Sequence, residues 1–355
     1  MHRFQPDALR TAVATVFAAA GCPDAEARQI ADHLVDANLA GHDSHGVIRL
    51  AKYIDWQRRG MVLPGRALAT LRDDGPLLIF DGGFGYGQSL GRAAMAAAIE
   101  RAMASGLAVM ALRNVGHLGR IGAWAEMATA AGLLSIHFVN TSGFGILVAP
   151  HGGSDRRLSA NPIAAGIPVA GGAPMILDMS TCVVAEGKIQ VARNKGMPLP
   201  EGAVLDGGGR PTQDAEAFYA SPPGAILPIA AHKGSGLSIL CEILAGALTG
   251  GGSSHPDNPS ADRLVNNMLT IVIDADGMAG ASAFAADVAR LQEWVKGSPP
   301  LAPDGEVLVP GEPERRCRAE RLAGGIPLDD ATCAQIAQAA DSVGIASSVL
   351  DRARI

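Results

Sequence analysis

The stretch FDGGFGYGQSLG, residues 80–91, decides between two folds for the middle of this chain. It follows a short apolar segment and opens an Ala-rich one, as the phosphate-binding turn of a dinucleotide fold would. Gly83 and Gly85 fit the first two places of a G-x-G-x-x-G fingerprint, but the third place falls on Gln88. The next apolar segment, 107–114, does not end in an acid that could hold a ribose. The stretch therefore favours a structural glycine-rich turn over a Rossmann nucleotide site.

The segments around this turn predict alternating strands and helices. Residues 77–82 and 107–114 predict strands on either side of a helix over 88–106, which is the spacing of a β-α-β unit. Farther along, a strongly apolar helix that we expect to be buried spans 234–251, and an amphipathic helix spans 280–298. The body of the chain is therefore expected to be α/β or α+β.

Both ends of the chain predict helices. Residues 6–21 carry apolar side chains on one stripe, residues 23–41 open with a proline and acidic residues, and both segments end at a glycine. The last forty residues return to a helical pattern. We therefore expect one helical unit built from both chain ends.

Composition limits the classes of function. The 355 residues are 48% hydrophobic and 18% charged, and their net charge of −6 gives no basic surface for nucleic acid or anionic lipid. Every apolar run is shorter than the roughly 18 residues of a membrane span, and the first residues do not resemble a signal peptide. The five cysteines are scattered without a C-x-x-C pair, which favours reduced thiols. We therefore expect a cytoplasmic protein that binds neither nucleic acid nor a membrane.

A second stretch, GHDSHGVIRL at residues 41–50, gathers polar side chains of the kinds that bind metals or transfer protons. His42, Asp43 and His45 are too few for a metal site, because the sequence has no H-E-x-x-H pattern or suitably spaced carboxylate pair to complete it. We therefore expect no metal ion.

Proton transfer suits this stretch better. His45 and Arg49 are four residues apart, so on a helix they share a face. Hydride transfer at a C–O carbon needs a group that titrates near neutral pH, and an arginine holds a substrate carboxylate through two parallel hydrogen bonds. Ser44 could orient the imidazole, and Tyr53 continues the same face. On spacing alone, Arg49 could equally be a solvated helix charge and His45 a helix cap.

The segment GHDSHGVIRLAKY, residues 41–53, resembles the S-H-G-x-x-R-x-x-x-Y segment of the malate/L-lactate dehydrogenase family, whose members lack a Rossmann fold. The resemblance continues in order through most of the chain, in the segments NVGHLGRIGAWAEMA, SANPIAAGIP, LDMSTCVVAEGKI, PTQDAEA, AHKGSGLSILCEILAGALTGG and VLVPGEPERRCRAER. Within the family, the chain is most similar to the hydroxycarboxylate dehydrogenase B type.

This resemblance implies an α+β fold. The cofactor domain of the family has a mostly antiparallel, non-Rossmann sheet, and a helical domain is built from both chain termini. In this chain the helical domain would comprise residues 1–72 with 312–355, and the α/β body would comprise 73–311, including the NAD(P)-binding domain at about 117–311. Members of the family form homodimers with active sites near the subunit interface.

The resemblance also implies roles for individual residues. The catalytic group comprises His45 as the acid/base, Ser44 beside it, Lys188, and His117 at the nicotinamide end of the cleft, where some members place the acid/base instead. The substrate group comprises Arg49, which holds the carboxylate, together with Tyr53 and Asn161. The cofactor, NAD or NADP, is expected to contact His117, Leu118, Gly119, Arg120, Ile121, Asp178, Met179, Ser180, Thr181, His232, Lys233, Pro310, Gly311 and Glu312.

Three departures from the family pattern bear on the sites. Ala160 stands where many relatives carry threonine, which removes a hydroxyl that could touch substrate, and the segment DMSTC stands where DMATS is common. Lys188 occupies a position where imine-reducing members carry an acid. A lysine opposes a protonated imine, so this residue weighs against a cyclic imino acid as substrate. Lys188 could instead pair with a cofactor phosphate or with Glu186.

The sequence therefore predicts an NAD(P)-dependent oxidoreductase that interconverts a small 2-oxocarboxylate and its 2-hydroxycarboxylate. The alternative enzyme is a reductase of cyclic imino acids of the Δ1-piperideine-2-carboxylate type. A catalytically inactive nucleotide-binding or oligomeric scaffold is a third hypothesis, and the presence of His45, Arg49 and Lys233 speaks against it.

Overall fold

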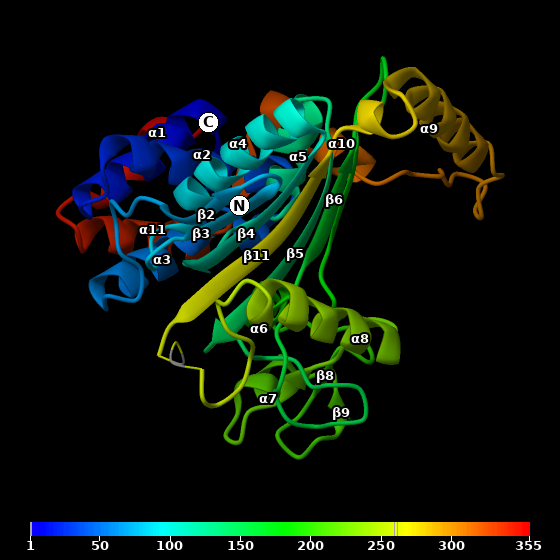
Figure 1. Ribbon diagram of the computed structural model, residues 1–355. Coiled ribbons are helices and arrows are strands. Elements are labelled where there is room, and N and C mark those ends of the chain that lie inside the picture. Colours follow the sequence, from blue (N-terminus) through cyan, green and yellow to red (C-terminus); the bar gives the residue numbers. More distant parts are fainter. Residues whose placement is uncertain (1, 259, 261) are drawn as a thin grey trace.

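The computed structural model describes residues 2–258, 260 and 262–355 of the chain. Its centre is a mixed sheet (Figure 1) with the strand order β2 (Ala69–Asp74), β3 (Leu77–Asp81), β4 (Leu107–Val115), β11 (Leu264–Ile273), β5 (Leu134–Gly143), β6 (Ile163–Ile167) and β7 (Met175–Met179). β3 and β4 run parallel, whereas β2–β3, β4–β11, β11–β5, β5–β6 and β6–β7 run antiparallel. The sheet is therefore mostly antiparallel.

The β-α-β unit predicted around the glycine-rich stretch is confirmed. Strand β3 leads through the helix α4 (Gly87–Ser105) to β4, and Leu77 pairs with Val109 in the parallel register. Strand β2, which the sequence did not predict, pairs antiparallel with β3 at the sheet edge. All residues of β2 are exposed, so its sequence lacks the alternation of apolar and polar residues by which a half-buried strand is recognised.

Helices α4 and α5 (Gly122–Ala130) cover one face of the sheet, as Figure 1 shows. Their apolar side chains share one core with the strands beneath them, and this core includes Leu78, Phe80, Met95, Met110, Trp124 and Val139. Each such large side chain stabilises the fold by roughly 1.5–3 kcal/mol through burial. This layer fixes the positions of the loops that leave β4 and enter α5.

The glycine-rich turn brings the first residue of α4 against the segment that follows β4. A Cβ atom on Gly87 would lie 2.5 Å from the carbonyl oxygens of both Gly116 and His117, which is closer than real Cβ contacts come. Only glycine fits at this approach of helix and loop. The turn therefore positions the backbone of His117.

The two ends of the chain lie side by side. Strand β1 (His2–Phe4) pairs antiparallel with β12 (Ile326–Leu328). Helices α1 (Pro6–Ala19), α2 (Asp24–Leu39) and α3 (Arg49–Arg58) from the beginning of the chain share a core with α11 (Asp330–Asp341) and the 3-10 segment η4 (Ser347–Ala353) from its end. This core contains Leu9, Val16, Phe17, Leu34, Ile336 and Leu350.

Residues between β7 and β11 form a lobe beside the main sheet. It contains α6 (Glu186–Lys195), α7 (Ala215–Tyr219), α8 (His232–Cys241) and a small sheet of β10 (Ala225–Ile226), β8 (Val204–Leu205) and β9 (Pro211–Thr212). Helix α8 continues into the π-helical turn η2 (Glu242–Ala247). The prediction of a buried helix over 234–251 is wrong for the single chain, because Ile239, Ile243 and Leu248 are 45%, 53% and 66% exposed. Their apolar face lies outside the cores of this chain.

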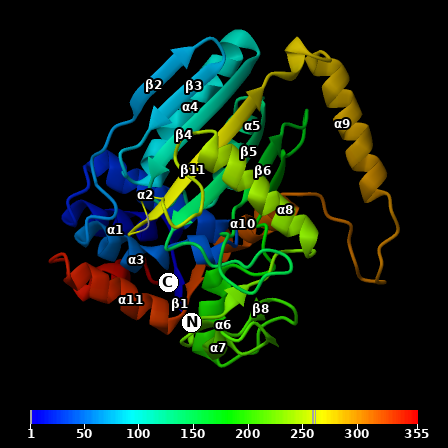
Figure 2. The ribbon, with the colours of Figure 1, turned by 60° about the horizontal axis from the view of Figure 1, so that its bottom comes forward.

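Helix α9 (Ala281–Lys296) follows the 3-10 turn η3 (Ala275–Gly277) and stands away from the sheet in both views (Figures 1 and 2). Every residue of α9 is at least partly exposed, and Trp294 is 81% exposed. The chain then returns through α10 (Glu312–Gly324), which packs against α2. Among the described residues, no helix combines the length and the apolarity that crossing a membrane requires.

Candidate active site

The structure brings His45 and His117 together from distant parts of the chain. His45 ends the 3-10 turn η1 (Asp43–His45), just before Arg49 begins α3, and His117 follows β4. The two imidazole rings stack with their centroids 5.5 Å apart and their planes 17° from parallel. The sequence predicted both residues as catalytic but could not show that they touch.

Tyr53 and Gln88 lie behind His117. The Tyr53 hydroxyl is 2.6 Å from Nδ1 of His117, and the Gln88 Nε2 lies 3.0 Å from that hydroxyl and 2.9 Å from the carbonyl oxygen of His117. Tyr53 and Gln88 are 2% and 1% exposed. Sequence reasoning used Gln88 only to reject the dinucleotide fingerprint, yet a polar residue at the start of an apolar helix was a signal for a buried hydrogen-bonding role.

Ser44 and Arg49 complete the group on the other side of His45. The Ser44 hydroxyl is 3.0 Å from Nδ1 of His45, and Nε of Arg49 donates to the Ser44 carbonyl oxygen at 2.6 Å. Within the described residues, the terminal nitrogens Nη1 and Nη2 of Arg49 make no hydrogen bond. These free donors can receive a carboxylate in bidentate fashion.

Burial keeps both histidines uncharged. Desolvation, followed by the positive charge of Arg49, lowers the pKa of His45 and of His117 well below the ordinary value of 6.5. Burial raises the pKa of Tyr53 well above its ordinary value of 10. At neutral pH the site therefore contains two neutral imidazoles, a neutral phenol and the cation of Arg49.

Helix α6 begins close to this group. A Cβ atom on Gly187 would lie 2.8 Å from the Cβ of Ser44, so the helix start packs against η1. Lys188 is exposed, and within the described part of the chain its side chain makes no hydrogen bond or ion pair. Glu186 instead forms an ion pair with Lys52 at 3.5 Å and accepts a hydrogen bond from Tyr219. The alternative that Lys188 pairs with Glu186 is therefore wrong.

Asn161 is buried inside the protein rather than exposed at a surface that could contact substrate. It is completely buried, its Oδ1 accepts from the backbone of Thr141, and its Nδ2 donates to Ser238 and to the Glu242 carboxylate. All of its polar atoms are therefore used within the protein. The carbonyl oxygen of the neighbouring Ala160 accepts from the Ser180 hydroxyl.

The loop 117–122 is held by side chains from surrounding elements. The backbone N–H of Leu118 donates to Asn266 at 2.8 Å, that of Arg120 to Nε2 of His33 at 2.9 Å, and that of Gly122 to Asp178 at 2.8 Å. A side chain at Gly119 would collide with His33. Burial lowers the pKa of His33 to about 3, so this ring stays neutral and keeps its acceptor nitrogen. Ile121 is buried beside them.

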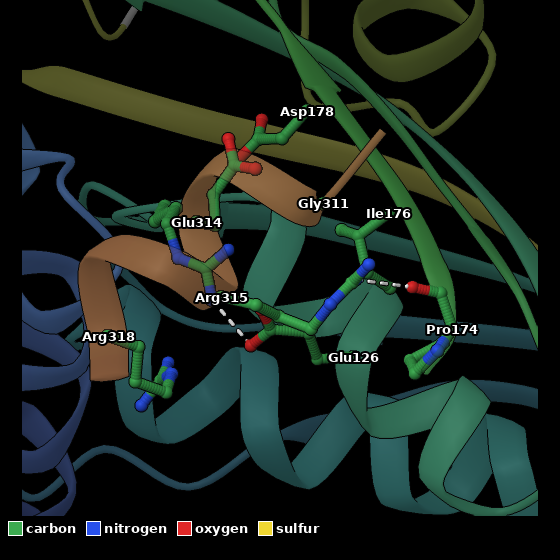
Figure 3. A pocket seen from close by; sticks show the side chains of 9 residues that line it. Glu126, Pro174, Ile176, Asp178, Gly311, Glu314, Arg315 and Arg318 are labelled. Carbon is green, nitrogen blue, oxygen red and sulfur yellow. Dashed lines mark hydrogen bonds and ion pairs between the residues drawn. The ribbon is translucent and has the colours of Figure 1, made fainter. Parts of the chain in front are cut away.

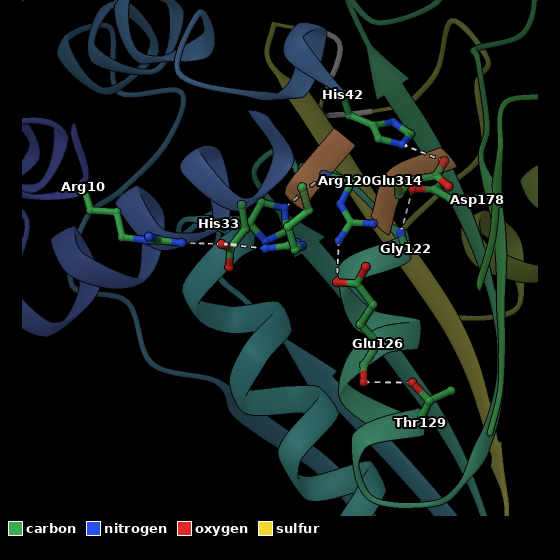
Figure 4. Close-up of polar contacts among 11 residues, drawn as sticks. Arg10, His33, His42, Arg120, Gly122, Glu126, Thr129, Asp178 and Glu314 are labelled. Atoms are coloured by element: carbon green, nitrogen blue, oxygen red, sulfur yellow. Dashed lines mark hydrogen bonds and ion pairs between the residues drawn. The ribbon is translucent and has the colours of Figure 1, made fainter. Parts of the chain in front are cut away.

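A cavity of about 180 Å³ adjoins this loop (Figure 3). Arg120, which is 2% exposed, donates to Glu126 at 2.5 Å, but within the described residues its Nε and Nη1 have no hydrogen-bond partner. Oε1 of Glu314 lies 3.3 Å from Nε2 of His42, and the carboxylate of Asp178 lies beside that of Glu314 (Figure 4). The cavity is lined by Arg120, Glu126, Pro174, Ile176, Asp178, Gly311, Glu314, Arg315 and Arg318.

The remaining residues expected at the cofactor are split between two places. Met179 follows Asp178 on β7, and the Pro310 carbonyl oxygen accepts from the backbone of Ile176 on the same strand, beside Gly311. Glu312 forms an ion pair with Lys296, in which Oε1 of Glu312 lies 2.5 Å from Nζ of Lys296.

The second place is the turn before α8, which the segment containing Ser180 and Thr181 contacts. The Thr181 carbonyl oxygen accepts from the backbone of Ile229, and His232 and Lys233 are exposed at the start of the helix. The buried Thr181 hydroxyl has no partner among the described residues. Of the histidine, cysteine and acidic residues in the described ranges, no three or more are grouped so as to hold a metal ion.

Comparison with known proteins establishes the family of the chain. Residues 4–337 match the family model described as malate/L-lactate dehydrogenase. The chain is 40% identical over 351 residues to hydroxycarboxylate dehydrogenase B of Escherichia coli (strain K12), covering 98% of this chain and 96% of that protein. It is 38% identical over 307 residues to an L-lactate dehydrogenase of Cupriavidus necator, covering 86% and 88%.

Solved structures show the same likeness. The sulfolactate dehydrogenase of Methanocaldococcus jannaschii superposes with a TM-score of 0.86 at 30% identity, covering 98% of this chain and 99% of that one. These matches confirm the resemblance that the motifs carried. The chain belongs to the malate/L-lactate dehydrogenase family.

Proposed function

We propose that this protein is an NAD(P)-dependent oxidoreductase that interconverts a small 2-oxocarboxylate and its 2-hydroxycarboxylate. The observation that carries the proposal is the free guanidinium fork of Arg49 beside the stacked pair of His45 and His117. A carboxylate bound to that fork places the neighbouring C–O group of the same substrate at the histidines. The hydroxyacid dehydrogenases to which the chain is similar support this substrate class.

The residues divide the chemistry between them. The nicotinamide, when bound, supplies or accepts the hydride at the substrate C2. In the oxidation direction, the neutral His45 takes the hydroxyl proton as the C–O bond gains double-bond character, and in reduction it returns that proton. Arg49 holds the carboxylate and so orients C2, and Ser44 holds the imidazole of His45 in position.

The residues around the cavity fit a negatively charged cofactor. The buried Nε–H and Nη1–H groups of Arg120 line it without a partner among the described residues, and phosphate or ribose oxygens would satisfy them. Lys233, which is exposed at the start of α8, supplies a second place for phosphate oxygens. Because the 80–91 turn is filled by packing against His117, we place NAD or NADP outside a Rossmann-type turn.

Two exposed apolar faces support a homodimer as the working form. Helix α9 carries Phe284, Val288, Leu291 and Val295 on one stripe, and α8 with η2 exposes Ile239, Ile243 and Leu248. Faces of this kind mark surfaces that another protein covers, and we assign them to a second copy of the chain. The five cysteines, all in described ranges, are free, which suits a reducing cytoplasm. We keep residues 1–72 with 312–355 as the helical domain and 73–311 as the body, except that residues 69–72, which belong to β2 of the main sheet, pass to the body.

The first experiment measures binding and turnover. We expect NADH or NADPH fluorescence to change on mixing, followed by reduction of at least one of pyruvate, oxaloacetate, 2-oxoglutarate and phenylpyruvate. A protein that binds cofactor and reduces only Δ1-piperideine-2-carboxylate would favour the imino-acid reductase. A protein that binds cofactor and turns over neither class would favour an inactive scaffold.

A further inference from the structure

The side-chain amide of Gln88 is buried next to the proposed active site, and within the described residues only its nitrogen makes hydrogen bonds. Its Oε1 has no hydrogen-bond partner among the described residues, whereas its Nε2 makes two contacts. A buried acceptor without a partner is destabilising, so such an atom in a native protein asks for a reason. The reason lies in the two contacts of Nε2, which hold the amide in an orientation that leaves Oε1 without a partner.

The orientation of this amide follows from chemistry. The carbonyl oxygen of His117, 2.9 Å away, can only accept, so the Gln88 atom that faces it must be the N–H₂ group. The same nitrogen lies 3.0 Å from the Tyr53 oxygen and donates its second hydrogen there. The Tyr53 hydroxyl therefore directs its own hydrogen to its remaining neighbour, the Nδ1 of His117 at 2.6 Å.

We propose that Gln88 is a positioning residue that, through Tyr53, fixes His117 as the tautomer protonated on Nε2. Because Nδ1 accepts the Tyr53 hydrogen, the single proton of the neutral ring must sit on Nε2. His117 then offers a hydrogen-bond donor to the C–O oxygen of the substrate and cannot take a proton from it. The tautomer stands on geometry alone, whereas its use toward that oxygen rests on the proposed function.

A protonated His117 does not fit this arrangement. Its Nδ1–H would need the Tyr53 oxygen as acceptor, and the Tyr53 hydrogen would then need Gln88 Oε1. Turning the amide to offer Oε1 would set that oxygen against the carbonyl oxygen of His117. The cations of Arg49 and Lys52, both on α3, act on His117 and oppose a second proton as well.

Glycine at position 87 makes this contact reachable. Because the start of α4 lies directly against the backbone of Gly116 and His117, the next side chain can reach the His117 carbonyl oxygen. The residue that breaks the dinucleotide fingerprint is therefore the residue that orients a catalytic ring.

The test is ¹⁵N NMR of the histidine ring nitrogens in the full-length protein without ligand. We expect the wild type to show an unprotonated Nδ1 and a protonated Nε2 for His117. In Gln88→Glu the carboxyl group accepts the Tyr53 hydrogen in either charge state, so the proton of His117 should move to Nδ1. A wild-type His117 protonated on Nδ1, or a tautomer unchanged in Gln88→Glu, would overturn the proposal.

Gln57→Glu is the matched control. Gln57 Oε1 accepts from the Tyr86 hydroxyl at 2.7 Å, in a similar glutamine–tyrosine pair that does not touch His117. We expect it to leave the His117 tautomer unchanged, and an equal effect of both variants would count against Gln88. If Gln88→Glu does not fold, Tyr53→Phe replaces it and should release Nδ1 from its donor, giving a mixture of tautomers; a single unchanged tautomer would overturn the proposal.

Turnover supplies a separate reading. For Gln88→Glu we expect kcat to fall on the order of 10- to 100-fold, as when a group that fixes a histidine tautomer is changed, with KM for the carboxylate nearly unchanged. A normal kcat together with an inverted tautomer would contradict the role toward substrate but leave the tautomer assignment standing. Because the NMR measurement needs no substrate, failure of the proposed function is distinguished from failure of this inference.

Discussion

The imidazole rings of His45 and His117 lie face to face, 5.5 Å apart between centroids and 17° from parallel. Desolvation and the charge of Arg49 lower the pKa of both rings, and His45 lowers that of His117 further. Both rings are therefore neutral at neutral pH. This relationship makes the division of roles between the two histidines a question that single substitutions can answer.

We predict that His45→Ala lowers kcat by at least ~100-fold with cofactor binding little changed, which is the usual scale for losing a general acid or base. His117→Ala should lower kcat less than His45→Ala does, because it removes a positioned donor rather than the acid/base, and the loss of the whole ring should also weaken binding of cofactor or substrate. Steady-state kinetics and cofactor fluorescence titrations measure the two effects. If His117→Ala abolishes turnover while His45→Ala is mild, the roles are reversed.

Arg49→Lys keeps the positive charge but removes Nε, which donates to the Ser44 carbonyl oxygen, and removes the planar fork. We expect a loss on the order of 1–3 kcal/mol, mostly in kcat/KM for carboxylate substrates. Arg58→Lys, at the exposed end of the same helix, is the control and should behave as wild type. A nearly normal Arg49→Lys enzyme would mean that another residue holds the carboxylate.

Lys188 gives a prediction about substrate choice. Its side chain is exposed and unpaired within the described residues, and it follows Gly187, which packs on Ser44, so we expect its charge to act on the reacting carbon once substrate is bound. A cation there favours a developing alkoxide and opposes an iminium ion. We expect kcat/KM for open-chain 2-oxoacids to far exceed that for Δ1-piperideine-2-carboxylate, and Lys188→Asp to narrow or invert the ratio. A wild type that prefers the cyclic imine would reject the proposed substrate class.

His137 predicts a loss of stability in acid. It is fully buried between the hydroxyls of Thr270 and Ser135, and burial lowers its pKa to about 3. Since the unfolded ring titrates near 6.5, the stabilisation from a neutral His137 is complete above that pH and is lost progressively as pH falls toward 3.

Between pH 7 and pH 5, wild type should therefore lose about 2 kcal/mol more unfolding free energy than His137→Gln, measured by urea denaturation at both pH values. His255→Gln, a change at an exposed histidine, is the control. Equal pH dependence of wild type and His137→Gln would show that this ring is not held neutral.

The apolar stripe on α9 predicts the oligomeric state. We expect the wild type to sediment as a dimer and Leu291→Glu, in the middle of the stripe, to shift it toward monomer. Ala286→Glu adds the same charge on the opposite side of the helix and should remain dimeric. A monomeric wild type, or a Leu291→Glu dimer of unchanged affinity, would contradict the assignment of this face to a second copy.

The sequence predicted much of the fold because the informative patterns are local. The alternation around residues 77–114 indicated the β-α-β unit, and the amphipathic pattern near 280–298 indicated α9. The sequence did not predict strand β2, because an exposed edge strand buries no apolar face. The sequence did not predict the exposure of Ile243 and Leu248, because an apolar helix has the same sequence pattern whether its own chain or another copy covers it.

The site was predicted residue by residue but not as an arrangement. Family motifs supplied His45, Arg49 and His117, yet the stacking of the rings depends on how η1 and the loop after β4 meet. Gln88 and His33 carry no motif of their own, because their importance lies in which backbone group each one faces. Such contacts across distant segments are not encoded in spacing along the chain.

The antiparallel pairing of β1 with β12 has a consequence for synthesis on the ribosome. Helices α1 and α2 are translated long before Ile336 and Leu350, which complete their core. We therefore expect α1 and α2 to keep part of their apolar surface uncovered until Leu350 has left the exit tunnel. We expect a nascent chain stalled before residue 326 to expose the apolar surface of α1 and α2, to which chaperones can bind.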